Sequence, residues 1–181
     1  MPTLVSDALG VDRNQLEDLG VFNGFVDVDA KLYVDPFLLT SARMPELRGA
    51  EKTFEQHFER VLKLLRASSG ANDVFMVNAT KRLTFPEVGT AGLGFAKHGR
   101  GGSGIGPELA TQLAATAHVI VKAGIEDPEM FQLAGLFQEN IGPDRISDMT
   151  IRVIFRHLAA FSERVAQEVK AKLEPVPSLP T

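Results

Sequence analysis

The chain has 181 residues, of which 44% are hydrophobic and 23% charged, so it is long enough for one ordinary domain with a sizeable core. It contains no cysteine, which excludes disulfides, thiolate nucleophiles and cysteine-ligated zinc. With a net charge of −4, no apolar run that could span a bilayer and no basic N-terminal segment, we expect a cytoplasmic protein with no membrane partner.

The sequence up to residue 84 predicts a short helix, then a small β element, then an amphipathic helix. Residues 4–19 are expected to form one short helix with leucines as its apolar anchors. Apolar and acidic residues alternate from Phe25 to Asp29, which predicts a small β element near residues 22–34. An amphipathic helix is expected over residues 46–68, whereas residues 72–84 fit either a short helix or a strand.

Proline marks four expected helix starts, because the first amide of a helix has no intrahelical partner to lose. The four sites are Asp35-Pro36, Gly106-Pro107, Asp127-Pro128 and Gly142-Pro143. They predict further helices over residues 107–123 and 128–139 and a long last helix that runs to about Leu173.

The expected fold class is therefore α+β and predominantly α-helical. Residues 1–173 are expected to form a single globular domain that ends in the long helix. Residues 174–181 are proline-rich and are interpreted as either a disordered tail or a linker to further chain.

A long glycine-rich loop at residues 89–106 is the first candidate site. Gly99 to Gly104 match the pattern G-x-G-x-x-G, and Pro107 opens a helix directly afterwards. Glycine allows a close approach of the backbone to an anion, and a helix N-terminus offers free N–H groups. The candidate ligand-binding residues are Lys97, His98, Arg100, Gly101, Gly102, Ser103 and Gly104.

The glycine segment lacks the strong preceding strand of a dinucleotide-binding motif, and it is not a Walker A loop. Three interpretations remain open: a flexible solvated loop, a contact with phosphate or a nucleic-acid backbone, and a contact with a protein partner. Because the chain has no tryptophan and one tyrosine, an aromatic platform for stacking bases is not expected. His98 is the histidine best placed for acid–base work.

Acidic residues form the second candidate site. Alternation places Asp27 and Asp29 on one face of a strand, with Asp35 nearby, while Asp144 and Asp148 are one helical turn apart. Such carboxylates could hold Mg²⁺ in a hydrolase or nuclease. The alternative is structural: a solvent-facing strand edge, a helix cap at Asp35 and ordinary acids at a helix N-terminus.

Three segments resemble the N-terminal region of large uncharacterised bacterial proteins associated with phage-defence gene neighbourhoods. They are LYVDPFLL, LTFPE with the following GLGFAKHGRGGSGIG, and IGPDRISDMTIRVI, and the resemblance covers most of residues 20–160. It implies a bacterial, cytoplasmic module in antiviral defence. It implies no activity and no catalytic residue.

Three functions are therefore carried forward. The first is a binding or sensing module of a defence-type protein that contacts phosphate, nucleic acid or a protein partner through the glycine-rich loop. The second is a metal-dependent hydrolase or nuclease that uses the aspartates. The third is a structural dimerisation domain that forms a homo-oligomer through an exposed apolar stripe on residues 150–170 of its last helix.

Overall fold

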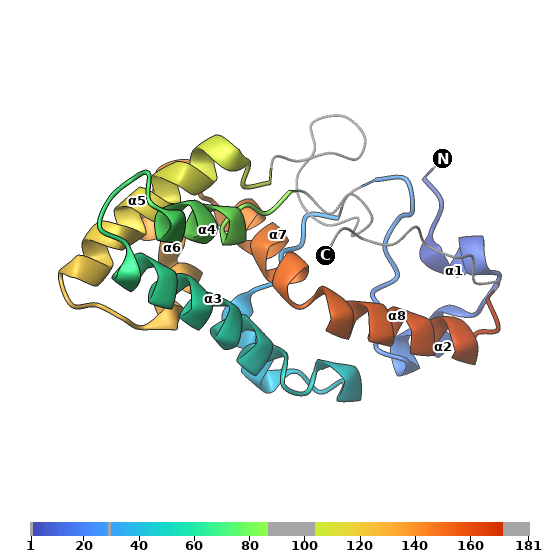
Figure 1. The fold of residues 1–181 in the computed structure, drawn as a ribbon. Helices are drawn as coiled ribbons and strands as arrows, with labels where there is room; N and C mark the ends of the chain where they lie inside the picture. Colours follow the sequence, from blue (N-terminus) through green and yellow to red (C-terminus); the bar gives the residue numbers. More distant parts are fainter. Residues whose placement is uncertain (1, 29, 87–103, 172–181) are drawn as a thin grey trace.

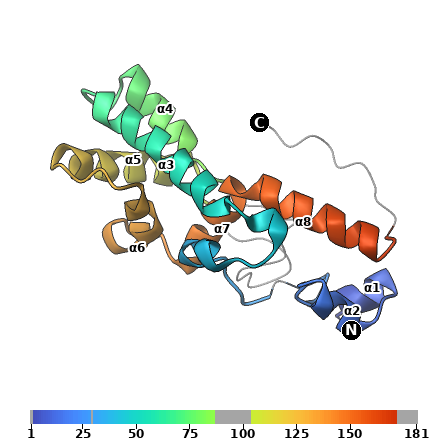
Figure 2. The ribbon, with the colours of Figure 1, turned by 90° about the horizontal axis from the view of Figure 1, so that it is seen from below.

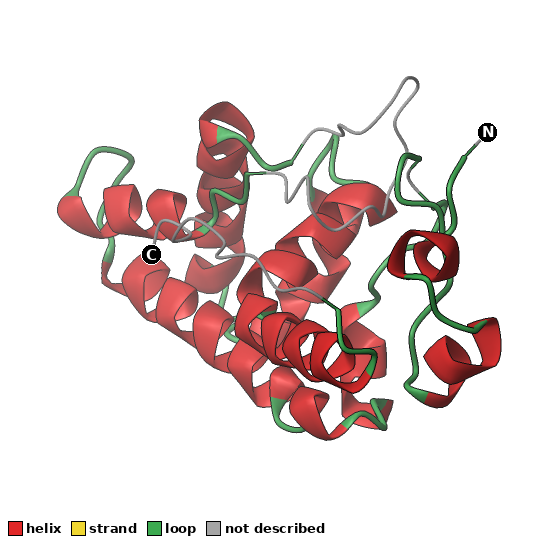
Figure 3. Ribbon diagram, turned by 90° about the vertical axis from the view of Figure 1, so that its right-hand side faces the viewer, coloured by secondary structure: helices red, strands yellow, loops and turns green. Residues whose placement is uncertain are grey.

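The computed structural model describes residues 2–28, 30–86 and 104–171. This part of the chain is predominantly helical, as expected, and Figure 3 shows helices joined by loops. No helix within it has both the length and the apolarity needed to cross a bilayer.

Two short helices, α1 (Val5–Leu9) and α2 (Arg13–Asp18), replace the single helix predicted for residues 4–19. That prediction was wrong because Gly10 adopts a left-handed conformation with φ of 66°, which ends α1. Asp12 then starts a new helix by accepting the backbone N–H of Asn14 at 2.8 Å.

The β element predicted near residues 22–34 is not confirmed, because the described residues of this segment form isolated bridge positions, such as the pair Leu4 and Phe25, and no strand. Val5 donates its backbone N–H to the carbonyl of Gly24 at 2.9 Å, and Val26 donates to Thr3 at 2.8 Å. The pairing extends no further along α1, since a residue in a helix directs its backbone groups along the helix axis.

Helix α3 (Ala50–Ala67) is the centre of the fold, and Figures 1 and 2 show the neighbouring helices gathered around it. Its apolar face confirms the stripe predicted for residues 46–68, although the first residues of that range form a separate turn. Phe54 and Phe58 are buried, and the Phe58 ring stacks on that of Phe131 at 4.6 Å between centroids. The elements that contact α3 are η1 (Pro36–Ser41), α4 (Val74–Arg82), α5 (Pro107–Lys122), η3 (Pro128–Leu133) and α7 (Pro143–Val153).

All four proline-marked starts are confirmed, at η1, α5, η3 and α7. Asp35 and Asp127 each accept the backbone N–H two residues further on, at 3.0 and 2.9 Å. The ambiguous segment at residues 72–84 is helix α4, which Asp73 caps. The range predicted as one helix at residues 128–139 is divided into η3 and the single turn α6 (Ala134–Phe137).

The predicted long last helix is broken at Ile154 into α7 and α8 (Phe155–Glu168). Ile154 has φ of −93° and ψ of 14°, and its side chain is buried in the core. Burying this side chain and the side-chain bond from Thr150 to the carbonyl of Ile146 at 2.7 Å both favour a bend. The helix also ends before Leu173, because Lys170 takes a left-handed conformation.

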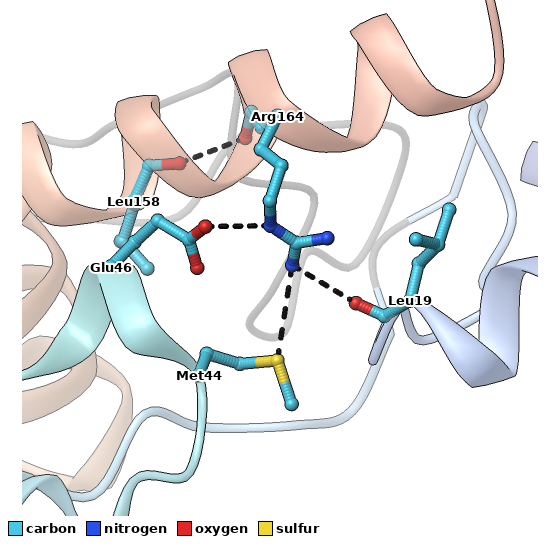
Figure 4. Close-up of polar contacts among 6 residues, drawn as sticks. Leu19, Met44, Glu46, Leu158 and Arg164 are labelled. Carbon is cyan, nitrogen blue, oxygen red and sulfur yellow. Dashed lines mark hydrogen bonds and ion pairs between the residues drawn. The ribbon is translucent and has the colours of Figure 1, made fainter.

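Helix α8 runs on from α7 towards the N-terminal helices (Figures 1 and 2), and one side chain joins them. Arg164 donates from Nε to the carboxylate of Glu46 at 2.6 Å, in the turn η2 (Pro45–Leu47). It also donates to the backbone carbonyl of Leu19 at 3.3 Å and lies near the sulfur of Met44. Figure 4 shows the guanidinium placed between these three segments, so it fixes α8 against both η2 and α2.

Candidate functional site

Two adjoining cavities form a groove across one face of the helical core. The first, of about 820 Å³, lies between α3 and the α7–α8 bend, and we call it lobe one. The second, of about 930 Å³, lies between α4, the start of α5 and α7, and we call it lobe two. His57, Arg152 and Val153 line both lobes, so the two cavities form one continuous groove.

The groove is strongly basic although the whole chain is acidic. Among the described residues, five cationic side chains line it, with Glu163 as the one carboxylate. None of the five forms an ion pair within the described part of the chain. The five are Arg60 of α3, Lys81 and Arg82 of α4, Arg152 of α7 and Arg156 of α8.

Helix electrostatics explains some of these cations but not all of them. Lys81, Arg82 and Arg152 lie in the last turns of α4 and α7, where the helix dipole favours positive charge. Arg156 lies in the first turn of α8, where the dipole disfavours it, and Arg60 lies in the middle of α3. Helix-end electrostatics therefore does not account for these two arginines.

His57 lies where the two lobes meet. Its Nε2 donates to the backbone carbonyl of Arg82 at 3.0 Å, and its ring packs 5.5 Å from that of Phe85. Burial lowers the pKa of His57, the bond to the Arg82 carbonyl opposes this, and the positive charges of Arg82 and Arg60 lower it further. The ring is therefore neutral near pH 7, and two of the groove's cations act on it directly.

His157 also lines lobe one, but both nitrogens of its ring already have hydrogen-bond partners within the chain. Its Nδ1 donates to the backbone carbonyl of Glu46 at 2.7 Å, and its Nε2 lies 2.9 Å from the hydroxyl of Thr53. These bonds tie α8 to both η2 and α3. His157 therefore shapes the wall of lobe one.

Described residues on either side of the glycine-rich segment lie beside lobe two. Phe85 and Ile105 exchange backbone hydrogen bonds of 2.9 and 2.8 Å, which hold these two stretches of chain together. Phe85, Pro86 and Pro107 line lobe two. Six of the predicted ligand-binding residues lie outside the described residues: Lys97, His98, Arg100, Gly101, Gly102 and Ser103.

Gly104 is the member of that predicted set that the structure describes. Its carbonyl accepts a hydrogen bond from Nε of Arg145 at 3.3 Å. The two residues line a separate cavity of about 510 Å³ at the N-terminus of α5, together with Glu108. Here an acid lies beside the free N–H groups of the helix, so this cavity is less suited to an anion than the groove.

The described aspartates are not gathered into a metal site. Asp27 accepts the backbone N–H of Thr3 at 3.0 Å, and Asp35 caps η1. Asp144 and Asp148 both lie on α7, and Asp148 is buried. The described residues contain no group of three or more histidines and acids arranged to hold a metal ion, and Asp29 lies outside those residues.

The apolar stripe proposed for dimerisation is covered within the chain. Ile151, Ile154 and Val165 are buried, and Leu158 packs against the core. Among the described residues of α7 and α8, no large hydrophobic side chain is exposed. The dimerisation hypothesis stays a prediction, and the half-buried side chains of Val153, Leu158 and Phe161 are the apolar surface left to it on these helices.

The sequence interpretation missed the groove. Arg152 and Arg156 are four residues apart, and His57 and Arg60 are three apart, which are signals of a shared helix face. Nothing in the spacing, however, brings α4 next to α7 and α8. That juxtaposition depends on packing against α3 and on the bend at Ile154.

Comparison with known proteins gives one positive result. A family model described as a domain of unknown function (DUF8370) matches residues 10–179. No curated protein and no solved structure matches the chain. Since the model covers nearly all of the sequence, the chain belongs to this family.

Proposed function

We propose that this member of the DUF8370 family is a binding module that holds a phosphate-bearing ligand in the basic groove. One observation carries the proposal: five cationic side chains line a concave surface with a single carboxylate, and none of the five is ion-paired within the described residues. Unpaired cations gathered in a concavity repel one another, and an anionic ligand relieves that repulsion.

The kinds of side chain support phosphate in particular. Four of the five cations are arginines, whose planar guanidinium groups bind phosphate oxygens through two parallel hydrogen bonds. Thr80 also lines the groove, and its hydroxyl can donate to phosphate. Low-dielectric walls around charges of one sign strengthen the local field despite the net charge of −4.

The glycine-rich segment is part of this proposal. Because described residues on either side of it lie beside lobe two, Lys97, His98, Arg100 and the amides from Gly101 to Gly104 are proposed to contact the same ligand. The segment from 89 to 106 contains no acid, which suits an anion. Two anion-binding features of different kinds, a groove and a glycine segment, would then act on one molecule.

The setting of the function rests on the resemblance to proteins of phage-defence neighbourhoods. On that basis we propose a bacterial, cytoplasmic sensing role, in which the ligand comes from an invader. A Mg²⁺-dependent hydrolase and a homo-oligomer formed through the last helix are the other two candidates. No arrangement of the described residues favours either of them over ligand binding.

The proposal is tested by thermal unfolding in the presence of inorganic phosphate, ATP, polyphosphate, and single- and double-stranded nucleic acids. At least one of these ligands should raise the Tm of the wild type, because a ligand that binds only the folded state stabilises it. The rise should shrink with added salt between about 50 and 300 mM. Arg60→Glu and Arg152→Glu should abolish it.

Arg13→Glu is the matched control, since Arg13 is an exposed arginine of α2 outside the groove. It changes the net charge equally and should keep the ligand-induced rise. Arg60 is exposed, so Arg60→Glu should fold normally and remain informative if Arg152→Glu is unstable. A rise that survives Arg60→Glu, or no rise with any ligand, would overturn the proposal.

A further inference from the structure

The groove has two separate sets of cations rather than one. Arg60 and Arg156 line lobe one, and Lys81 and Arg82 line lobe two, while Arg152 and His57 lie at the junction. Each lobe has the volume of an ordinary small-molecule pocket. A single phosphate group can satisfy one set of cations and leaves the other unneutralised. A ligand that uses the whole groove must carry several phosphates along its length.

The walls between the cations are apolar. Val153 lies at the junction, Phe155, Ala159 and Ala160 line lobe one, and Phe85 and Pro86 line lobe two. Phe155 and His57 are half-buried residues of this lining. A purely anionic polymer would leave these walls in contact with water. A strand of nucleotides covers them with its bases while its phosphates meet the cations.

The concave shape of the groove argues against a double-helical nucleic acid as its ligand. Proteins read duplex DNA by inserting a helix or a β-ribbon into its grooves, which requires a projecting element. Here the cations lie inside a concavity between helices, with both lobes small enough for single nucleotides. Channels of this kind, with basic rims and apolar or aromatic walls, are typical of proteins that bind single strands.

We infer that the ligand of the groove is single-stranded nucleic acid, with successive nucleotides occupying lobe one, the junction and lobe two. This inference rests on the proposed phosphate binding and names its ligand. The low aromatic content of the chain limits stacking to two rings, so backbone contacts supply most of the affinity. Binding should therefore depend on strand length more than on base sequence.

The experiment measures fluorescence anisotropy of labelled oligo-dT and oligo-U of about three, six, twelve and eighteen nucleotides. Affinity should rise with length until the strand spans both lobes and then level off. Arg60→Ala in lobe one and Lys81→Ala in lobe two should each weaken the twelve-nucleotide strand by about three- to tenfold. Arg13→Ala should leave its affinity unchanged. A difference between oligo-dT and oligo-U would show whether the 2′-hydroxyl is recognised.

A labelled single nucleotide provides the sharper test. It can occupy one lobe only, so it should lose affinity in one of the two variants and not in both. Polyphosphate, ATP and an eighteen-base-pair duplex serve as competitors, and all three should compete poorly.

Competition by polyphosphate, ATP or duplex as strong as that of the single strand would overturn this inference while leaving phosphate binding intact. If none of these ligands binds, both the single-strand inference and the proposed phosphate binding are overturned.

Discussion

At the scale of single residues, His57 reports on the groove's electrostatics. Its ring is half-buried between α3 and α4, and Arg60 and Arg82 lie close enough to act on its charge. Burial first, and then these two cations, lower its pKa below the usual 6.5 or so. The smaller part of the lowering therefore comes from the positive charge that the proposed ligand would neutralise.

We predict that an NMR titration of the His57 ring gives a pKa below about 6.5, and that Arg60→Ala raises it. The unfolded chain takes up the proton first, so His57 makes stability fall as the pH drops from about 6.5 towards the folded-state pKa. The wild-type Tm should therefore fall more steeply in this window than that of His57→Gln. Arg13→Ala should leave the pKa unchanged, and an equal rise in both arginine variants would refute the local effect.

At the scale of elements, the start of α4 is fixed by one carboxylate. Oδ1 of Asp73 accepts the backbone N–H of Met76 at 2.8 Å. Oδ2 accepts the N–H of Ser69 at 2.6 Å and the hydroxyl of Ser68 at 3.0 Å. These donors, with the Met76 N–H foremost, hold the pKa of Asp73 well below its usual range. The cap sets the start of the helix whose last turn carries Lys81 and Arg82.

We predict that Asp73→Ala lowers the Tm at pH 7 by about 3–6 °C, because the N-cap and the turn before it are both lost. The difference from wild type should persist down to about pH 5 and shrink as the pH falls below about 4, because the unfolded chain then takes up a proton at Asp73 before the folded carboxylate does. Asp12→Ala, which removes the cap of the shorter helix α2, should lower the Tm by a smaller amount than Asp73→Ala does. A Tm difference that does not change between pH 7 and 3 would contradict this account.

At the scale of the whole molecule, Arg164 connects the ends of the described chain. It joins α8 to η2 and α2 through Glu46 and the Leu19 carbonyl, and it also lies 5.3 Å from the Phe161 ring. The Glu46 backbone N–H, and then Arg164, lower the pKa of Glu46 against the opposing effect of burial. Because α8 contacts mainly η2 and α7, this connection is what holds the outer wall of lobe one.

We predict that Arg164→Met speeds hydrogen exchange in α1, α2 and α8 by about tenfold and leaves α3 protected, because local contacts are lost while the core stays intact. In the wild type, the same opening should increase in acid as the pH falls through the lowered pKa of Glu46, because protonation of its carboxylate removes the ion pair with Arg164. Lys170→Met, beyond the end of α8, is the control and should exchange as the wild type does. Uniformly faster exchange in all helices would show that Arg164 supports the whole fold instead.

Local chemistry in the sequence determined the helical class and many of the element starts. Proline after a capping residue predicted η1, α5, η3 and α7, because this geometry depends on only a few neighbouring residues. The spacing of apolar residues in the sequence predicted helix α3, because one face of an amphipathic helix must be buried. The glycine-rich segment could also be identified by composition, although its predicted contacts lie outside the described residues.

Tertiary structure alone decided the rest. The pairing of residues 22–34 failed because α1 begins at Val5, and the last helix bent because Ile154 is buried in the core. The groove required Arg60 and Arg82, from the consecutive helices α3 and α4, to lie near Arg152 and Arg156 on α7 and α8, which come much later in the sequence. A sequence pattern reports which residues share a helix face, whereas the meeting of separate faces follows from how side chains pack between helices.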